Sequence, residues 1–144
     1  MGFAEHPQTV AEHIKRRRFE LGISQLQLAQ RLDACVYTVI TWECHDNNPS
    51  FAFWPGLIDF LGYDPYGEPR TLGECLSWLR RRNGVELPAC AEMIGVGTST
   101  LRFWERGGKP TNARTRYLLR TYLAYERARL KLPASFGIDP DRPI

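Results

Sequence analysis

The pattern of hydrophobic and polar positions along the chain is that of short helices. No stretch sustains the strict alternation of apolar and polar residues that a half-buried strand requires. Val39 and Trp42 lie three residues apart, as do Leu101 and Trp104, so each pair shares one apolar face of a helix. We therefore predict that both tryptophans belong to hydrophobic cores and that the fold is all-α.

The chain contains an internal repeat with an offset of 62 residues. Residues 9–43 align without gaps on residues 71–105, and eight of the 35 positions are identical, against roughly two expected from average composition. A repeat of this kind indicates two copies of one small supersecondary unit. The identical pairs are Thr9/Thr71, Glu12/Glu74, Arg18/Arg80, Gly22/Gly84, Ala29/Ala91, Thr38/Thr100, Trp42/Trp104 and Glu43/Glu105.

Both copies carry signals for the starts and ends of helices. Gly22 and Gly84 stand about three turns after the first start, where a residue with a left-handed backbone ends a helix. We expect the second helix of copy one to run to about Leu32 and the third to span about 35–43. The helix starts are predicted by the capping-box spacing of Thr9 with Glu12, Ser24 with Gln27, and Thr71 with Glu74.

The repeat divides the chain into two units of about four short helices each. Pro55 and Gly62 mark the start and the end of a fourth helix in copy one. The corresponding helix of copy two is longer and rich in Arg. We expect a first unit at 9–62, a turn-rich linker at 63–70, a second unit at 71–131 and a loose tail rich in Pro and Asp at 132–144.

Composition argues against several classes of protein. The apolar runs are far shorter than the ~20 residues of a membrane span, and residues 1–10 lack the pattern of a secretory signal. No phosphate-binding loop or catalytic constellation is recognisable, so we do not expect an enzyme. We expect a cytoplasmic protein with free, mostly buried thiols, no metal and no cofactor, because no zinc spacing links the histidines with Cys35, Cys44, Cys75 and Cys90.

Two stretches of the chain resemble a known DNA-binding motif. They are GISQLQLAQRLDACVYTVITWE in copy one and GVELPACAEMIGVGTSTLRFWERGGKP in copy two. Two short helices joined by a tight turn, with Trp-Glu closing the second, resemble the helix-turn-helix of Cro and phage-repressor-type (XRE) regulators. The resemblance covers about residues 9–131 and implies two tandem lambda-repressor-like units.

The resemblance implies roles for particular residues. In that family the second helix begins against the DNA backbone and the third lies in the major groove. Gln25 matches the position whose amide meets a phosphate. Arg18 with Glu43, and Arg80 with Glu105, match an ion pair that joins the first helix to the third. The groove-facing, base-reading positions are Val36, Tyr37, Ile40 and Thr41 in copy one and Thr98, Ser99, Arg102 and Phe103 in copy two.

Both copies also depart from the family pattern. Copy two has Leu87 and Pro88 where the family has Gln and a helix former, so it lacks the backbone-contacting amide. Copy one has Asp33, Cys35 and His45 where Gly, Ser and Gly are usual. Neither copy is therefore a complete match.

Charge distinguishes the two copies. Residues 9–62 hold five basic and six acidic side chains, a balance of −1, whereas residues 71–131 hold twelve and five, a balance of +7. Because affinity for duplex DNA comes largely from neutralised phosphates, copy two should supply most of it. The candidates for contact with the DNA backbone there are Arg106, Lys109, Arg114 and Arg116.

Two functions from different classes fit these observations. The leading one is sequence-specific binding of double-stranded DNA by a bacterial or phage-type transcriptional regulator associated with the nucleoid. The alternative is a protein-interaction adaptor or antitoxin built on degenerate units, which the apolar groove face of copy one favours. The two copies could form an intramolecular pseudo-dimer or the chain a homodimer, and no small-molecule ligand is evident.

Overall fold

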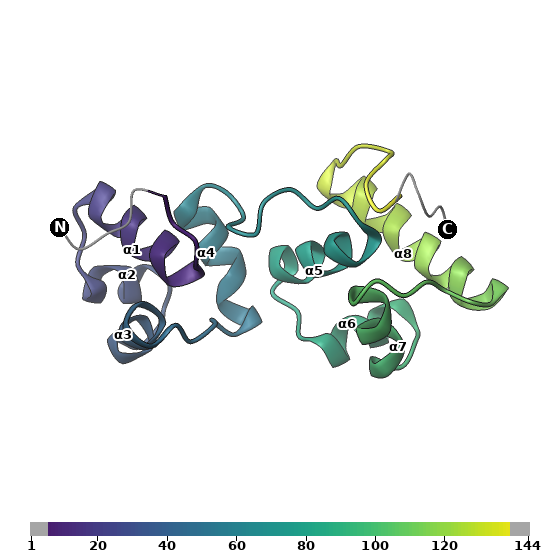
Figure 1. The fold of residues 1–144 in the computed structure, drawn as a ribbon, viewed down its shortest axis with the longest axis horizontal. Helices are drawn as coiled ribbons and strands as arrows, with labels where there is room; N and C mark the ends of the chain where they lie inside the picture. Colours follow the sequence, from purple (N-terminus) through teal and green to yellow (C-terminus); the bar gives the residue numbers. More distant parts are fainter. Residues whose placement is uncertain (1–5, 139–144) are drawn as a thin grey trace. The chain divides into compact units, whose positions relative to one another are not determined.

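The computed structural model describes residues 6–138. It confirms the all-α fold, since the described part of the chain contains eight α-helices, one short 3-10 helix and no strand. In chain order these are α1 (Val10–Leu21), α2 (Gln25–Arg31), α3 (Val36–His45), η1 (Phe51–Phe53), α4 (Trp54–Leu61), α5 (Leu72–Asn83), α6 (Leu87–Ile94), α7 (Thr98–Glu105) and α8 (Ala113–Leu130) (Figure 1).

The helices form two compact units, with the boundary between Gly67 and Glu68. Each unit has its own hydrophobic core. Trp42 is 3% exposed in the core of unit 1, and Trp104 is 1% exposed in the core of unit 2, so both tryptophans are core residues as predicted. Burying a large apolar side chain is worth about 1.5–3 kcal/mol, so each tryptophan helps to fix its third helix.

The predicted helix ends agree with the structure, and the predicted starts agree in part. Gly22 and Gly84 end α1 and α5 with φ of 67° and 69°, the left-handed region that favours glycine. Ser24 and Gln27 form the complete capping box of α2. Thr9 and Thr71 cap α1 and α5 through their side chains.

The other half of the capping box differs from the prediction at α1 and α5. The Glu12 carboxylate accepts a hydrogen bond from the backbone N–H of Gln8 at 2.7 Å, and Glu74 accepts one from the N–H of Arg70 at 2.8 Å. In both cases the glutamate reaches one residue beyond the capping threonine. The capping threonine has an extended backbone at both helices, and the glutamate carboxylate accepts its hydrogen bond from the residue before that threonine.

Within each unit the first three helices pack together. α1 and α2 both contact α3 in unit 1, and α5 and α6 both contact α7 in unit 2. α5 and α7 approach so closely that a Cβ on Gly73 would lie 2.7 Å from the backbone oxygen of Glu105. The fourth helix closes each core, with α4 against α1 and α8 against α6.

The segment expected to be a linker, 63–70, is partly packed against unit 1. The Tyr63 hydroxyl lies 2.7 Å from Nδ1 of His13, and the ring of Tyr66 lies 5.9 Å from that of Trp54. The segment predicted as a short linker thus contacts α1 and α4 through two tyrosines, whose side chains remain exposed.

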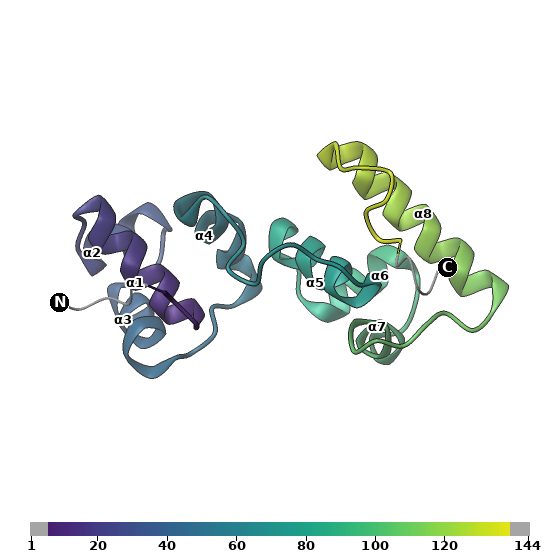
Figure 2. The same ribbon diagram turned by 45° about the horizontal axis from the view of Figure 1, so that its top comes forward.

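The tail expected to be loose, 132–144, is packed over its first half. Residues 131–138 fold back along α8 (Figure 2). The Phe136 ring meets Trp78 edge-on at 5.2 Å between centroids, and Arg127 donates a 2.7 Å hydrogen bond to the Phe136 carbonyl oxygen. The Phe136 ring thus holds the first half of the tail against unit 2, despite the turn-rich composition of this segment. Residues 139–144 lie outside the described residues.

Candidate nucleic-acid interface

Two bidentate ion pairs fix the third helix of each unit against the first. Arg18 donates to the Glu43 carboxylate from Nε and Nη2, both at 2.8 Å. Arg80 donates to Glu105 in the same way, at 2.7 and 2.9 Å. The hydrogen bond to Glu43 raises the pKa of Arg18. These are the pairs that the family resemblance implied, and their geometry sets the outward face of α3 and of α7.

The third donor to each carboxylate differs between the units. Gln25 donates from Nε2 to Glu43 at 3.3 Å, whereas in unit 2 the hydroxyl of Ser77 donates to Glu105 at 3.1 Å. Gln25 was expected to meet a DNA phosphate, and the structure shows one of its two amide hydrogens directed to Glu43. Ser77 was not singled out from the sequence, because its register partner, Lys15, gives no hint of this role.

The outward face of α7 carries most of the base-reading candidates of unit 2. Ser99, Arg102 and Phe103 are exposed, and Thr98 is half-buried. The Phe103 ring is 55% exposed, and it covers Gly108 so closely that an added Cβ there would lie 2.3 Å from the ring. The ring is therefore held in place from one side while its other side faces solvent.

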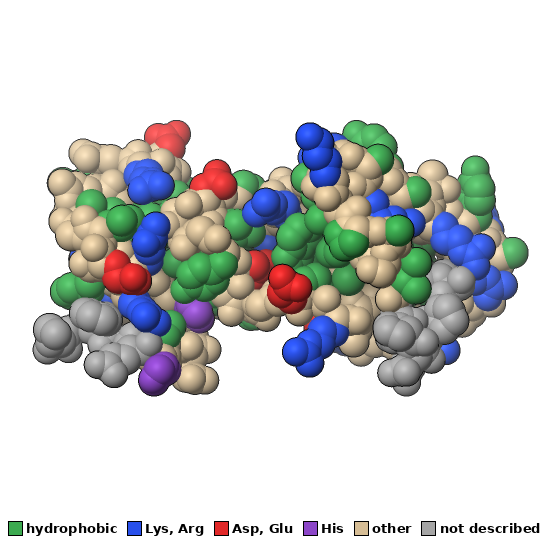
Figure 3. All heavy atoms as spheres, turned by 90° about the horizontal axis from the view of Figure 1, so that it is seen from above, with side chains coloured by type: hydrophobic (Ala, Val, Ile, Leu, Met, Phe, Trp, Pro, Cys, Tyr) green, Lys and Arg blue, Asp and Glu red, His purple; other side chains and the backbone are tan. Residues whose placement is uncertain are grey.

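Lys and Arg side chains continue from the outward face of α7 to the first turn of α8. Arg106, Lys109 and Arg114 are exposed and Arg116 is half-buried. Figure 3 shows Lys and Arg side chains gathered at the end of unit 2 where α8 begins. Beside them lies an open groove of about 290 Å³, lined by Ser99, Thr100, Phe103, Trp104, Lys109, Thr111, Asn112 and Thr115. Hydroxyl, amide and ammonium groups thus provide the donors that a phosphate oxygen needs.

The corresponding face of unit 1 is different in character. Tyr37 is 67% exposed and Ile40 is half-buried. Val36 packs against the core of unit 1, so only part of its side chain faces outward. The Thr41 hydroxyl donates to the Thr38 carbonyl oxygen at 2.7 Å, which leaves its methyl group as the outward feature. Cys44, exposed one turn after Ile40, completes this face and was not among the predicted site residues.

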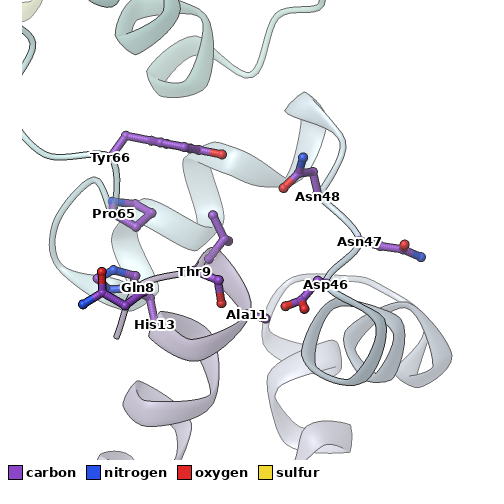
Figure 4. A pocket seen from close by; sticks show the side chains of 10 residues that line it. Gln8, Thr9, Ala11, His13, Asp46, Asn47, Asn48, Pro65 and Tyr66 are labelled. Atoms are coloured by element: carbon purple, nitrogen blue, oxygen red, sulfur yellow. The ribbon is translucent and has the colours of Figure 1, made fainter. Parts of the chain in front are cut away.

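A polar pocket of about 260 Å³ lies elsewhere on unit 1, between the start of α1, the segment after α3 and residues 65–66 (Figure 4). Its lining includes the carboxylate of Asp46 and no Lys or Arg side chain, so it does not extend a phosphate-binding surface. His13 lies at its edge, where burial and, secondarily, the nearby Arg16 lower the pKa of the imidazole.

The described residues contain neither a cluster of three potential metal ligands nor a helix long and apolar enough to cross a membrane. All four cysteines are free. The sequence predicted mostly buried thiols, but this is correct only for Cys75 and Cys90, since Cys35 and Cys44 are exposed. Cys35 is the capping residue at the start of α3, and Cys44 lies in the last turn of this helix.

Comparison of the chain with models of known protein families, with curated proteins and with solved structures identified no match. The interpretation of the surface therefore rests on its own geometry and chemistry.

Proposed function

We propose that the protein binds double-stranded DNA in a sequence-dependent manner, as a bacterial or phage-type transcriptional regulator acting at the nucleoid in the cytoplasm. The observation that carries this proposal is the exposed donor-rich surface of α7 and the start of α8, on a unit with a balance of +7. The resemblance of both units to the helix-turn-helix of XRE regulators points the same way, with α3 and α7 as the groove-facing helices.

We expect the basic side chains of unit 2 to supply most of the affinity for DNA. If Arg106, Lys109, Arg114 and Arg116 each neutralise one phosphate, the logarithm of the binding constant should fall with the logarithm of salt concentration with a slope of about −3.6. Unit 1, with a balance of −1, adds little to this term.

Base discrimination in unit 2 falls mainly to Arg102. An arginine can donate both of its fork hydrogens to the two acceptors of guanine in the major groove, the commonest specific contact. Ser99 and Thr98 can bond to any base edge, and Phe103 can contact a thymine methyl group. In unit 1, Ile40 and the methyl group of Thr41 offer only apolar contacts of this last kind.

The proposal is tested by binding of the full chain to random-sequence duplex DNA over a range of salt concentrations. Replacing Arg106 and Lys109 by Gln should weaken binding uniformly and reduce the salt slope by about 1.8. The matched control replaces Lys15 and Arg16 of α1 by Gln, which removes the same charge from unit 1. Equal losses from both double variants, or no binding at low salt, would refute the assignment.

A protein-interaction adaptor or antitoxin remains the second candidate. The observation that favours it is the apolar outward face of α3, where Tyr37 is exposed and no lysine or arginine is present. A pure adaptor would show almost no salt-dependent binding to random DNA, so the same titration separates the two functions.

A further inference from the structure

One long side of α8 is exposed to solvent. The residues that α8 buries in the core of unit 2 lie on its other side and are Leu119, Tyr122, Leu123 and Glu126. Tyr117, Thr121 and Tyr125 are exposed, and their spacing of four places them on one ridge of the helix. Arg120, which is also exposed, adjoins this ridge three residues after Tyr117. We call these four residues the α8 face, and α8 lies at the edge of unit 2 in both ribbon views (Figure 1, Figure 2).

The two tyrosines of the α8 face present aromatic surface to solvent. Tyr117 is 68% exposed and Tyr125 is 62% exposed, more than any other large apolar side chain described in unit 2. They are eight residues apart, which is about 12 Å along a helix axis. Thr121 and Ala124, which lie between them, have small side chains, and the Thr121 hydroxyl donates to the Tyr117 carbonyl oxygen at 2.8 Å. A planar group can therefore lie against each ring.

The exposed charge on α8 is positive. The helix contains five arginines and a single acidic residue, Glu126, which is 1% exposed. Glu126 accepts a hydrogen bond from Arg129 at 2.6 Å, so its negative charge is directed into unit 2 and away from Arg120. Charge complementarity therefore calls for an anionic occupant. A second copy of the chain would bring arginines together on the same face, which is unfavourable.

Among anionic partners, the aromatic rings distinguish one class. The bases of a duplex lie inside the stack, so their flat surfaces are closed to Tyr117 and Tyr125. An acidic peptide offers carboxylates to Arg120 but no regular series of flat groups to the two rings. A single-stranded nucleic acid offers both, because each nucleotide carries a phosphate and a base whose π face can stack on an aromatic side chain.

We propose that the α8 face binds single-stranded nucleic acid, with one base stacked on Tyr117, another on Tyr125 and a phosphate held by Arg120. At the rise of roughly 3.4 Å per nucleotide of a stacked strand, the 12 Å between the tyrosines corresponds to three or four nucleotides. This activity is additional to duplex binding, whose candidates on α8, Arg114 and Arg116, lie in the first turn of the helix.

The first test measures the fluorescence anisotropy of labelled oligothymidine and oligouridine, each of ~12 nucleotides, titrated with the full chain. At low salt the dissociation constant of at least one of the two is expected below ~50 μM. Tyr117→Leu and Tyr125→Leu should each weaken binding at least fivefold, because leucine is apolar but has no π face. The matched variants, Tyr117→Phe and Tyr125→Phe, keep the ring and should bind as the wild type does. No binding by the wild type, or equal losses for leucine and phenylalanine, overturns the proposal.

The second test concerns the phosphate contact. Arg120→Gln should reduce the salt slope of oligothymidine binding by about 0.7, the value for one phosphate of a single strand. Arg82→Gln is the matched control, because it removes the same charge from an exposed position on α5 of the same unit. Equal reductions by both variants would show that the net charge of unit 2, and not the α8 face, holds the strand.

The remaining measurements separate this proposal from its competitors. Polyglutamate should displace the oligonucleotide only weakly, and displacement that depends on Tyr117 and Tyr125 as strongly as oligonucleotide binding does would assign the face to an acidic peptide instead. Tyr117→Leu should leave binding to random duplex DNA unchanged, and an equal loss on duplex would make the α8 face part of the duplex surface.

The two proposed activities also fail separately. A chain that binds duplex DNA but neither oligonucleotide overturns this inference and leaves the proposed function intact. A chain that binds single strands through Tyr117 and Tyr125 but shows no binding to duplex DNA supports this inference and refutes the proposed function.

Discussion

Replacing Gly73 by alanine should destabilise unit 2, although alanine is normally the better helix residue. A Cβ at this position would lie 2.7 Å from the backbone oxygen of Glu105 and 2.8 Å from that of Trp104, and ordinary contact begins near 3.4 Å. Both obstructing atoms belong to the backbone of α7, so no side-chain rotation relieves the overlap. α5 and α7 would have to separate by about 0.7 Å at this point.

The expected cost follows from two opposing terms. Alanine favours a helix over glycine by about 0.5–1 kcal/mol. Overpacking costs about 1–3 kcal/mol, and the upper half of that range applies because the bidentate bond of Arg80 to Glu105 joins the same two helices. The net loss is about 1–2.5 kcal/mol, which should lower the melting temperature of a unit of this size by about 4–20 °C.

Differential scanning calorimetry of the full chain is the appropriate assay, because each unit has its own core and is expected to unfold in its own transition. The transition of unit 1 should not move. As a control, Gly97→Ala adds the same methyl group where the nearest atom, Oγ1 of Thr100, is 4.0 Å away, and it should cost less than ~1 kcal/mol. A Gly73→Ala protein as stable as the wild type would show that α5 and α7 are not in close contact.

Three further predictions concern single side chains. Arg102→Ala should cost about 1–3 kcal/mol at one base position and relax preference there, and an unchanged preference in selection from random duplexes would exclude it as a base reader. Trp104→Ala should cost about 3–5 kcal/mol and unfold or loosen unit 2, which near-normal melting would contradict. Burial lowers the pKa of His13, so below pH ~6.5 the unfolded chain binds protons more readily than the folded one. The stability of unit 1 should therefore decline as the pH falls below that value, and denaturant unfolding of His13→Gln should show this decline reduced.

The features that could be predicted from the sequence are those that depend on local backbone geometry or on the repeat. Gly22 and Gly84 end their helices as expected, since a left-handed residue is a local requirement that few other side chains meet. The ion pair of Arg80 with Glu105 was expected from the family resemblance, and the recurrence of both members in register with Arg18 and Glu43 supported it.

The features that could not be predicted depend on contacts between residues far apart in the sequence. Tyr63 meets His13 across 50 positions, and Phe136 meets Trp78 across a similar distance, so turn-rich composition gave no sign of either contact. Glu126 is a second example. A basic helix predicts a solvated glutamate, yet Glu126 is buried and accepts hydrogen bonds from Asn83 and Arg129.

The third hydrogen-bond donor to the buried glutamate differs between the units, since it is Gln25 in unit 1 and Ser77 in unit 2. Both carboxylates, Glu43 and Glu105, receive three side-chain hydrogen bonds, although the third donor comes from the second helix in one unit and from the first helix in the other. The third helix of unit 1 is therefore tied to its unit by as many side-chain hydrogen bonds to its glutamate as that of unit 2, although α3 itself contains no Lys or Arg. With a supported third helix that bears no Lys or Arg, unit 1 fits the protein-interaction alternative better than it fits DNA reading.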